Sequence, residues 1–211
     1  MNKELPTILF DVDGVLFNTK RNMMASWNDV NKKFNLQIKF EHYFSKIGIP
    51  FQKILQKLKI KKNNASIEKY YKKKSVFYIK LIKIYPNVKD TIDNLIKNGY
   101  KIGVVTSKDK KRTLQLLKNF NLNISSIVCP SKSLRGKPYP DQILKALKIT
   151  KTANNNAIYI GDSKVDYVAA RKSNIKFIFA KYGYGKIKNE KVSTIKNLLE
   201  LKKYISINNF T

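Results

Sequence analysis

Polar side chains follow three apolar segments of the sequence, at the point where each segment ends. In chain order the residues are Asp11 and Asp13 after residues 7–10, Thr106 after residues 101–105, Lys137 in a later loop, Asp162 after residues 157–160, and then Asp166. If the apolar segments are strands of one parallel sheet, their carboxyl ends meet at the edge where ligands bind in such sheets. The pattern therefore predicts a site built from carboxylates, a lysine and a hydroxyl.

The four aspartates would repel one another if they shared one cleft. Two unit charges about 4 Å apart cost about 4 kcal/mol at an effective dielectric constant of about 20. Such a cluster must bind a cation, take up protons or pair with a base. Hard oxygen ligands suit Mg²⁺, which commonly binds through few carboxylates, waters and a substrate phosphate. The cluster therefore predicts a Mg²⁺ site.

Lys137 and Thr106 supply groups that bind a phosphate beside such a metal. The lysine ammonium is a positive charge, and the threonine hydroxyl is a hydrogen-bond donor. Backbone N–H groups after Asp13 and after Thr106 can also face an anion where the next segment begins. Together with the aspartates, these groups indicate a phosphate site with a metal and a carboxylate nucleophile within reach.

Each of these short motifs also has an ordinary structural explanation. Asp-x-Asp-Gly is commonly a turn, and Thr106-Ser107 suits the N-cap of a helix over residues 110–119. Lys137-Pro138 suits a loop, and Gly161-Asp162-Ser163 suits the start of a capped helix. The functional interpretation depends on all four motifs occurring in order, each after an apolar strand or before a helix.

The elements that must position these residues alternate between helices and strands after Tyr85-Pro86. The expected helices are 88–97, 110–119, 141–148 and 165–173, and the expected strands are 101–105, 126–129, 157–160 and 176–180. With a first strand at residues 7–10, this alternation predicts an α/β fold in which helices cover a parallel sheet.

Residues 18–85 follow a different pattern, which predicts a helical insert after the first strand. Apolar residues recur at helical spacing at Met24, Trp27, Val30 and Phe34, again over residues 51–58, and again over residues 70–82. No strand is evident in this segment. We therefore expect a core of residues 1–17 and 86–211 and a helical cap of residues 18–85.

The chain is strongly basic, with 43 Lys and Arg against 14 Asp and Glu and a formal net charge of +29. Such a charge can indicate nucleic-acid binding, but the basic residues are mostly lysines spread along the whole chain. We interpret them as a composition bias that attracts anionic substrates, and we expect no nucleic-acid partner. No apolar stretch approaches the roughly 20 residues that span a bilayer, and the N-terminal residues do not resemble a signal peptide. We expect a cytoplasmic protein with no membrane partner.

In four stretches the chain resembles the haloacid dehalogenase superfamily, specifically its phosphatases with a helical cap after the first strand, the phosphoglycolate-phosphatase-like group. The stretches are Phe10-Asp-Val-Asp-Gly-Val15, Tyr85-Pro86 through Val104-Val-Thr-Ser-Lys108, Gly136-Lys-Pro-Tyr-Pro-Asp141, and Tyr159-Ile-Gly-Asp-Ser163 with Asp166. The resemblance implies a Rossmann-like core, a mobile helical cap and a Mg²⁺-dependent phosphohydrolase that acts on a small phosphorylated metabolite.

The resemblance also implies catalytic roles. Asp11 resembles the nucleophile that becomes an aspartyl-phosphate, and Asp13 resembles the general acid and base. Thr106 resembles the hydroxyl that binds the phosphate. Lys137 resembles the lysine that balances the charge on Asp11 and on the phosphoryl group.

For the metal, the resemblance implies Asp11, the backbone carbonyl of Asp13 and Asp162 as direct ligands. Asp166 resembles a partner that lies outside the ligands and acts on the metal indirectly.

Four further residues are expected to contact the substrate. Ser107 and Lys108 follow the phosphate-binding threonine, and Gly48-Ile-Pro50 forms a turn in the cap. A similar Gly-x-Pro turn lies in this part of related caps, and glycine lets the backbone approach a ligand closely. We expect Gly48 and Pro50 to face the catalytic cleft.

Asp13 favours phosphoryl chemistry within the superfamily, because dehalogenases lack an aspartate two residues after the nucleophile and phosphonatases carry an alanine there. A sugar phosphomutase would keep the same residues and stays an alternative, as do a non-catalytic receiver-like module and a basic binding module. The large insert counts against the receiver-like module. The sequence leaves the substrate open among a sugar phosphate, phosphoglycolate and a nucleotide, and it does not define the oligomeric state.

Overall fold

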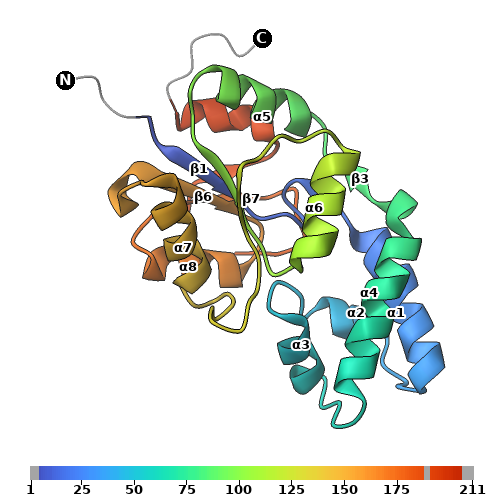
Figure 1. Cartoon of the computed structure of the whole chain (residues 1–211). Helices are drawn as coiled ribbons and strands as arrows, with labels where there is room; N and C mark the ends of the chain where they lie inside the picture. Colours follow the sequence, from blue (N-terminus) through green and yellow to red (C-terminus); the bar gives the residue numbers. More distant parts are fainter. Residues whose placement is uncertain (1–4, 188–190, 206–211) are drawn as a thin grey trace.

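The computed structural model describes residues 5–187 and 191–205, and it contains an α/β core with a helical insert (Figure 1). The core sheet has six strands in the order β5-β4-β1-β6-β7-β8, and every neighbouring pair is parallel. The strands are β1 (Thr7–Phe10), β4 (Ile102–Val105), β5 (Ser126–Val128), β6 (Ala157–Gly161), β7 (Lys176–Ala180) and β8 (Thr194–Ile195). The predicted fold class is therefore confirmed.

Helices cover both faces of this sheet, and the alternating side chains of β1 separate two hydrophobic layers. The helices are α5 (Val88–Lys97), α6 (Lys110–Asn119), α7 (Asp141–Thr150) and α8 (Lys164–Lys172), with the 3₁₀ helices η2 (Asn154–Asn156) and η3 (Leu198–Lys203). Ile8 and Phe10 belong to the layer that includes α5, α6 and η3, whereas Leu9 belongs to the layer of α7 and α8. Because β1 is a central, fully buried strand, the residue after it, Asp11, lies at the middle of the sheet edge.

The helical insert lies between β1 and β4 and has a hydrophobic cluster of its own. Its helices are α1 (Lys20–Phe34), α2 (Phe40–Phe44), α3 (Phe51–Lys57) and α4 (Asn64–Phe77), followed by the 3₁₀ helix η1 (Ile79–Leu81). Trp27 is fully buried in this cluster, where its ring stacks on Tyr43 at 4.2 Å and its Nε1 donates to the carbonyl of Ile38. Among the described helices of both parts, none is long and apolar enough to cross a membrane.

Two short strands join the insert to the core, where the sequence analysis expected none. β2 (Phe17–Asn18) and β3 (Lys83–Ile84) form an antiparallel pair at the two points where the chain enters and leaves the insert. Strands of two residues are too short to show an alternating pattern, and β8 was missed for the same reason. The division into residues 1–17 with 86–211 and residues 18–85 stays a prediction.

One residue expected on the buried face of α1 lies outside it. Met24 is 42% exposed, and its neighbour Met23 is buried in its place. Both methionines lie at helical spacing from Trp27, so the apolar pattern of the sequence did not show which of the two is buried.

We expect Trp27→Ala to lower the free energy of unfolding by about 3 to 5 kcal/mol, because it empties a fully buried site. Urea denaturation followed by circular dichroism measures this change. Met24→Ala on the same helix is the matched control, and we expect it to change stability by less than about 0.5 kcal/mol. Equal effects of the two substitutions would contradict the packing described for the insert.

Candidate active site

Lys137 joins two carboxylates beneath the end of the central strand. Its Nζ lies 2.9 Å from Oδ2 of Asp11 and 2.5 Å from Oδ1 of Asp166, and its side chain is fully buried. Burial alone would lower the pKa of Lys137, but the charges of Asp11 and Asp166 outweigh it and hold the pKa above its ordinary value. Lys137 therefore stays charged and fixes the orientation of Asp11.

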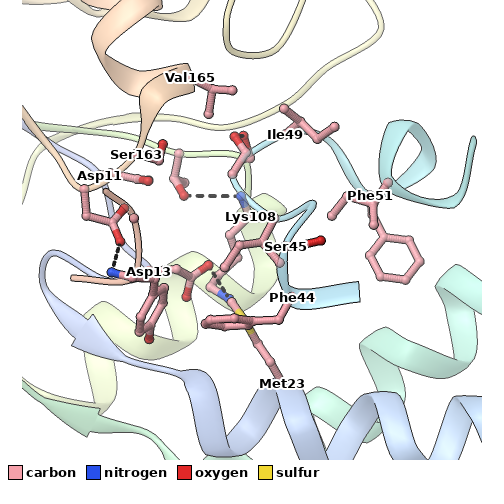
Figure 2. Close-up of a pocket in the computed structure, with 18 of the residues that line it drawn as sticks. Asp11, Asp13, Met23, Phe44, Ser45, Ile49, Phe51, Lys108, Ser163 and Val165 are labelled. Carbon is pink, nitrogen blue, oxygen red and sulfur yellow. Dashed lines mark hydrogen bonds and ion pairs between the residues drawn. The ribbon is translucent and has the colours of Figure 1, made fainter. Parts of the chain in front are cut away.

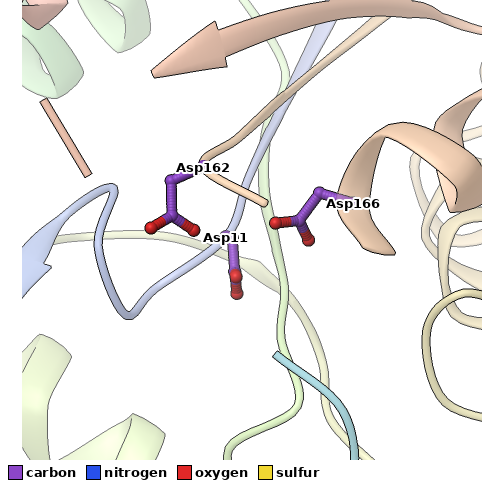
Figure 3. Close-up of side chains that lie close together, drawn as sticks. All are labelled: Asp11, Asp162 and Asp166. Atoms are coloured by element: carbon purple, nitrogen blue, oxygen red, sulfur yellow. The ribbon is translucent and has the colours of Figure 1, made fainter. Parts of the chain in front are cut away.

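Three aspartates form a buried cluster at this point (Figure 3). Asp11, Asp162 and Asp166 each place one carboxylate oxygen within 4.8 Å of the others. No described lysine or arginine forms an ion pair with Asp162, whose Oδ2 accepts a hydrogen bond from the N–H of Tyr184 at 2.6 Å. Burial, followed by the charges of Asp166 and Asp11, raises the pKa of Asp162 well above its ordinary value. A bound cation would relieve this uncompensated charge, so the donor set suits a hard divalent metal.

Asp166 already has partners on both of its oxygens. Oδ1 accepts from Lys137 and from the hydroxyl of Tyr159 at 3.1 Å. Oδ2 accepts from the N–H and the hydroxyl of Ser163, which forms a capping box with Asp166 at the start of α8. Asp166 is thus occupied in positioning Lys137 and α8. Ser163 therefore caps the start of α8, which is the ordinary structural explanation of the Gly161-Asp162-Ser163 motif. Asp162 takes no part in this cap.

Asp13 lies at the mouth of the same site and pairs with Lys108. Nζ of Lys108 is 3.1 Å from Oδ2 of Asp13, and Oδ1 of Asp13 has no hydrogen-bond partner among the described residues. Burial lowers the pKa of Lys108, and Asp13 opposes that shift. Gly14 adopts φ +87°, and a Cβ there would lie 2.1 Å from Oδ2 of Asp162. Glycine is therefore required for the turn after Asp13 to pack against Asp162.

Thr106 is buried directly after β4, and its hydroxyl is available to a ligand. Its Oγ1 accepts from the N–H of Lys108 at 3.2 Å, so the hydroxyl proton remains to be donated. The cap of α6, which Thr106-Ser107 could have explained, is instead Asp109, whose Oδ1 accepts from the N–H of Arg112. Capping therefore does not account for Thr106.

A cavity of about 360 Å³ opens above these residues, between the core and the insert (Figure 2). The predicted site residues that line it are Asp11, Asp13, Gly48, Thr106, Ser107, Lys108 and Asp162. Side chains of the insert, among them Met23, Phe44, Ile49 and Phe51, form an apolar wall opposite the aspartates. Lys137 and Asp166 lie below this surface.

The Gly48-Ile-Pro50 turn touches the core at two places. Ser107 donates its hydroxyl to the carbonyl of Gly48 at 2.8 Å, and a Cβ on Gly48, which has φ +91°, would lie 3.0 Å from Cγ2 of Val165. Pro50 does not line the cavity; its ring packs on Gly136, where an added Cβ would meet Cγ of Pro50 at 2.4 Å. The structure thus brings Gly48 to the cavity and places Pro50 beside it, against the loop that carries Lys137.

The sequence analysis missed Tyr184 as a site residue. Besides its N–H bond to Asp162, its hydroxyl accepts from the N–H of Thr19 at 2.6 Å, and its ring contacts Phe44 at 5.1 Å. Tyr184 therefore links the aspartate cluster, the entry to the insert and the cavity wall. The Tyr-Gly-Tyr-Gly run at residues 182–185, which begins two residues after the end of a predicted strand, was the available signal.

Residues 8–180 match the family model of haloacid dehalogenase-like hydrolases, and the chain belongs to this family. It is 28% identical to pyrophosphatase PpaX of Bacillus mycoides over 83% of this chain and 83% of that relative. It superposes on a predicted phosphatase from Clostridium acetobutylicum with a TM-score of 0.80 and 26% identity, covering 95% of this chain and 98% of the other. A predicted phosphoglycolate phosphatase from Haemophilus somnus shares the fold, with a TM-score of 0.79 and 23% identity over 97% of this chain and 99% of the other. The resemblance and the enzyme class expected from the sequence, a phosphoric ester hydrolase, are therefore confirmed.

We expect Asp11→Asn to stabilise the metal-free protein at pH 7.5. Burial, opposed by Lys137, raises the pKa of Asp11 from 3.8 to about 6. A carboxyl whose pKa is raised by folding binds its proton more tightly when folded, so its contribution to stability falls as the pH rises from about 4 to about 6. Above about pH 6, the ionised carboxylate of Asp11 therefore lowers the free energy of unfolding by an amount on the order of 3 kcal/mol.

Thermal unfolding in chelator measures this effect. The melting temperature of Asp11→Asn should exceed that of the wild type at pH 7.5, and the difference should shrink at pH 5. Asp90→Asn removes an exposed aspartate and should change little at either pH. A lower melting temperature for Asp11→Asn at pH 7.5 would contradict the assignment of a strained buried charge.

We expect Gly48→Ala to lower kcat/KM for p-nitrophenyl phosphate by about tenfold, because the new Cβ is strained at positive φ and pushes the turn away from Val165. Gly99→Ala is the matched control, since Gly99 has φ +80° but only Leu5 nearby, at 3.8 Å. It carries the same backbone strain without the contact between insert and core. If both substitutions lower kcat/KM equally, the Gly48 turn has no role in closing the cavity.

Proposed function

We propose that the chain is a Mg²⁺-dependent phosphohydrolase that cleaves a small phosphomonoester through an aspartyl-phosphate on Asp11. The observation that supports this most directly is the buried Lys137 ammonium, 2.9 Å from Asp11 and below a cavity large enough for a small metabolite. A lysine so placed opposes the effect of burial on the pKa of Asp11 and orients the carboxylate for attack, which favours its use as a nucleophile.

For the metal, we propose Asp11, Asp162 and the backbone carbonyl of Asp13 as ligands. The lack of a cationic partner for Asp162 among the described residues supports this choice. When bound, the ion neutralises charge on the phosphoryl group. Asp166 is left outside the ligands, because Lys137 and Ser163 occupy its oxygens.

In the first step, a carboxylate oxygen of Asp11 forms a bond to phosphorus while the bond from phosphorus to the leaving oxygen breaks. Asp13, in its protonated form, donates a proton to that leaving oxygen. The hydroxyl of Thr106 donates a hydrogen bond to the phosphoryl group, and Lys137 balances its negative charge. The products of this step are the free alcohol and the aspartyl-phosphate.

In the second step, Asp13, now ionised, takes a proton from a water molecule as that water attacks phosphorus. The bond between phosphorus and Asp11 breaks, which releases inorganic phosphate and restores the carboxylate. Asp13 lies on the cavity wall opposite the apolar side chains of the insert, where it can orient the attacking water.

The substrate candidates come from the sequence and from the relatives. Phosphoglycolate, a sugar phosphate and a nucleotide were open from the sequence, and the name of the Bacillus mycoides relative adds pyrophosphate. A sugar phosphomutase would use the same core residues. It would need a phosphorylated activator and release little free phosphate, which separates it from a phosphatase by experiment.

Release of phosphate from p-nitrophenyl phosphate tests the proposed function. We expect turnover with Mg²⁺ and no activator, no turnover in excess chelator, and a loss of about a thousandfold or more in Asp11→Asn, because an amide is not a nucleophile here. Ca²⁺ should inhibit, since its longer bonds of about 2.3–2.6 Å and larger shell would engage both oxygens of Asp11. Full activity in chelator, or in Asp11→Asn, would refute the mechanism.

A further inference from the structure

Arg112 is a buried cation on the wall of the cavity. It belongs to the first turn of α6, its side chain is only 12% exposed, and it is the one arginine among the described residues that lines the cavity. The proposed mechanism gives it no task, because the reacting phosphoryl group is served by Thr106 and Lys137. A buried charge at a ligand cavity calls for a specific partner.

The guanidinium group is held by one of its two edges. Its Nε donates to Oδ2 of Asp109 at 2.5 Å, and the backbone N–H of Arg112 donates to Oδ1 of the same carboxylate. Burial would lower the pKa of Arg112, but Asp109 more than compensates, so the side chain stays charged. Asp109 does not line the cavity. The guanidinium also hydrogen-bonds the hydroxyl of Tyr71, and the donors that its terminal amino groups still offer suit binding of a carboxylate or phosphate.

Tyr71, on α4 of the insert, supplies a second donor beside the guanidinium group. The guanidinium carbon of Arg112 lies 5.5 Å from the centroid of the Tyr71 ring. The hydroxyl of Tyr43 donates to the hydroxyl of Tyr71 at 2.8 Å, so no described residue accepts the Tyr71 proton. Tyr71 also lines the cavity. The Tyr71 hydroxyl therefore has a proton to donate, and Arg112 has further amino protons beyond those bound by Asp109 and Tyr71.

Lys108, the other cation of this segment that lines the cavity, is already paired. Lys108 binds Asp13 at 3.1 Å, and the insert side of the cavity is formed largely by apolar residues such as Met23 and Phe51. Two further lysines, Lys164 at the start of α8 and Lys186, also line the cavity. Beside Tyr71 of the insert, Arg112 is the cation that a second anion of a bound substrate would meet. The cavity volume of about 360 Å³ favours a compact molecule.

We propose that Arg112, assisted by the hydroxyl of Tyr71, binds a second anionic group, a carboxylate or a phosphate, on the leaving-group side of the substrate. This inference rests on the proposed function and narrows it. The preferred substrates are compact phosphate esters or anhydrides with two anionic ends, and phosphate esters of uncharged alcohols are poor substrates.

The test compares specificity ratios for the wild type and Arg112→Gln with Mg²⁺. The probes are 2-phosphoglycolate, whose second anion is a carboxylate, pyrophosphate, whose second anion is a phosphate, and p-nitrophenyl phosphate, which has none. We expect the ratio of kcat/KM for at least one doubly anionic probe to that for p-nitrophenyl phosphate to fall about thirtyfold in the variant. The probe whose ratio falls identifies the second anion. Unchanged ratios for both probes overturn the inference.

Arg135→Gln is the matched control. Arg135 also binds an aspartate, Asp141, but its side chain is 65% exposed and lies outside the cavity. Its removal should leave both ratios unchanged. If the specificity ratios fall as far in Arg135→Gln as in Arg112→Gln, the effect is a general one of charge, and the assignment to Arg112 is overturned.

Arg112→Gln leaves Asp109 without its partner, so Tyr71→Phe serves as a second variant that removes only a hydroxyl. In Tyr71→Phe, we expect the ratio of kcat/KM for the doubly anionic probe to kcat/KM for p-nitrophenyl phosphate to fall about threefold. An unchanged ratio counts against the inference. A wild type that releases phosphate from p-nitrophenyl phosphate but from neither doubly anionic probe also overturns it. A wild type that hydrolyses none of the three with Mg²⁺ refutes the proposed function instead, so the two failures are distinguishable.

Discussion

The contact on which the site depends is the one between the Lys137 ammonium and the carboxylates of Asp11 and Asp166. Three aspartates within 4.8 Å would repel one another strongly in a buried place without this charge. A single lysine satisfies two of them and leaves Asp162 as the carboxylate without a cation among the described residues. Within one small cluster, Asp166 is therefore used to pair with the lysine, whereas Asp162 is left to bind a metal.

The insert completes the cavity through contacts that are few and directional. The carbonyl of Gly48 receives a hydrogen bond from Ser107, and the ring of Tyr184 meets Phe44. The buried residues of the insert form a cluster of their own, against which Val165 of α8 packs from the core. The insert thus keeps its own hydrophobic cluster and meets the sheet core through individual side-chain contacts.

The sequence predicted the parallel sheet and the aspartates at its edge, because long buried strands show clear apolar runs and the polar residues follow them directly. It did not predict β2 and β3, since two residues carry no periodicity. Tyr184 was missed although the Tyr-Gly-Tyr-Gly run that contains it is visible in the sequence. Arg112 and Tyr71 were missed because their meeting depends on how the insert packs against the core. The residues near each of these positions in the sequence do not determine that packing. Gly48 could be placed from the family resemblance, whereas the position of Pro50 against Gly136 required the fold.

The central position of β1 has a consequence for the order in which the chain folds. Ile8 pairs with Ile102 on one side and with Ile158 on the other, so both partners are distant in sequence. During synthesis β1 emerges long before either partner, whereas α1 and α4 of the insert are much closer in sequence and can pack first. The nascent chain thus carries an unpaired apolar strand until β4 and β6 arrive, and a strand in this state is prone to aggregation.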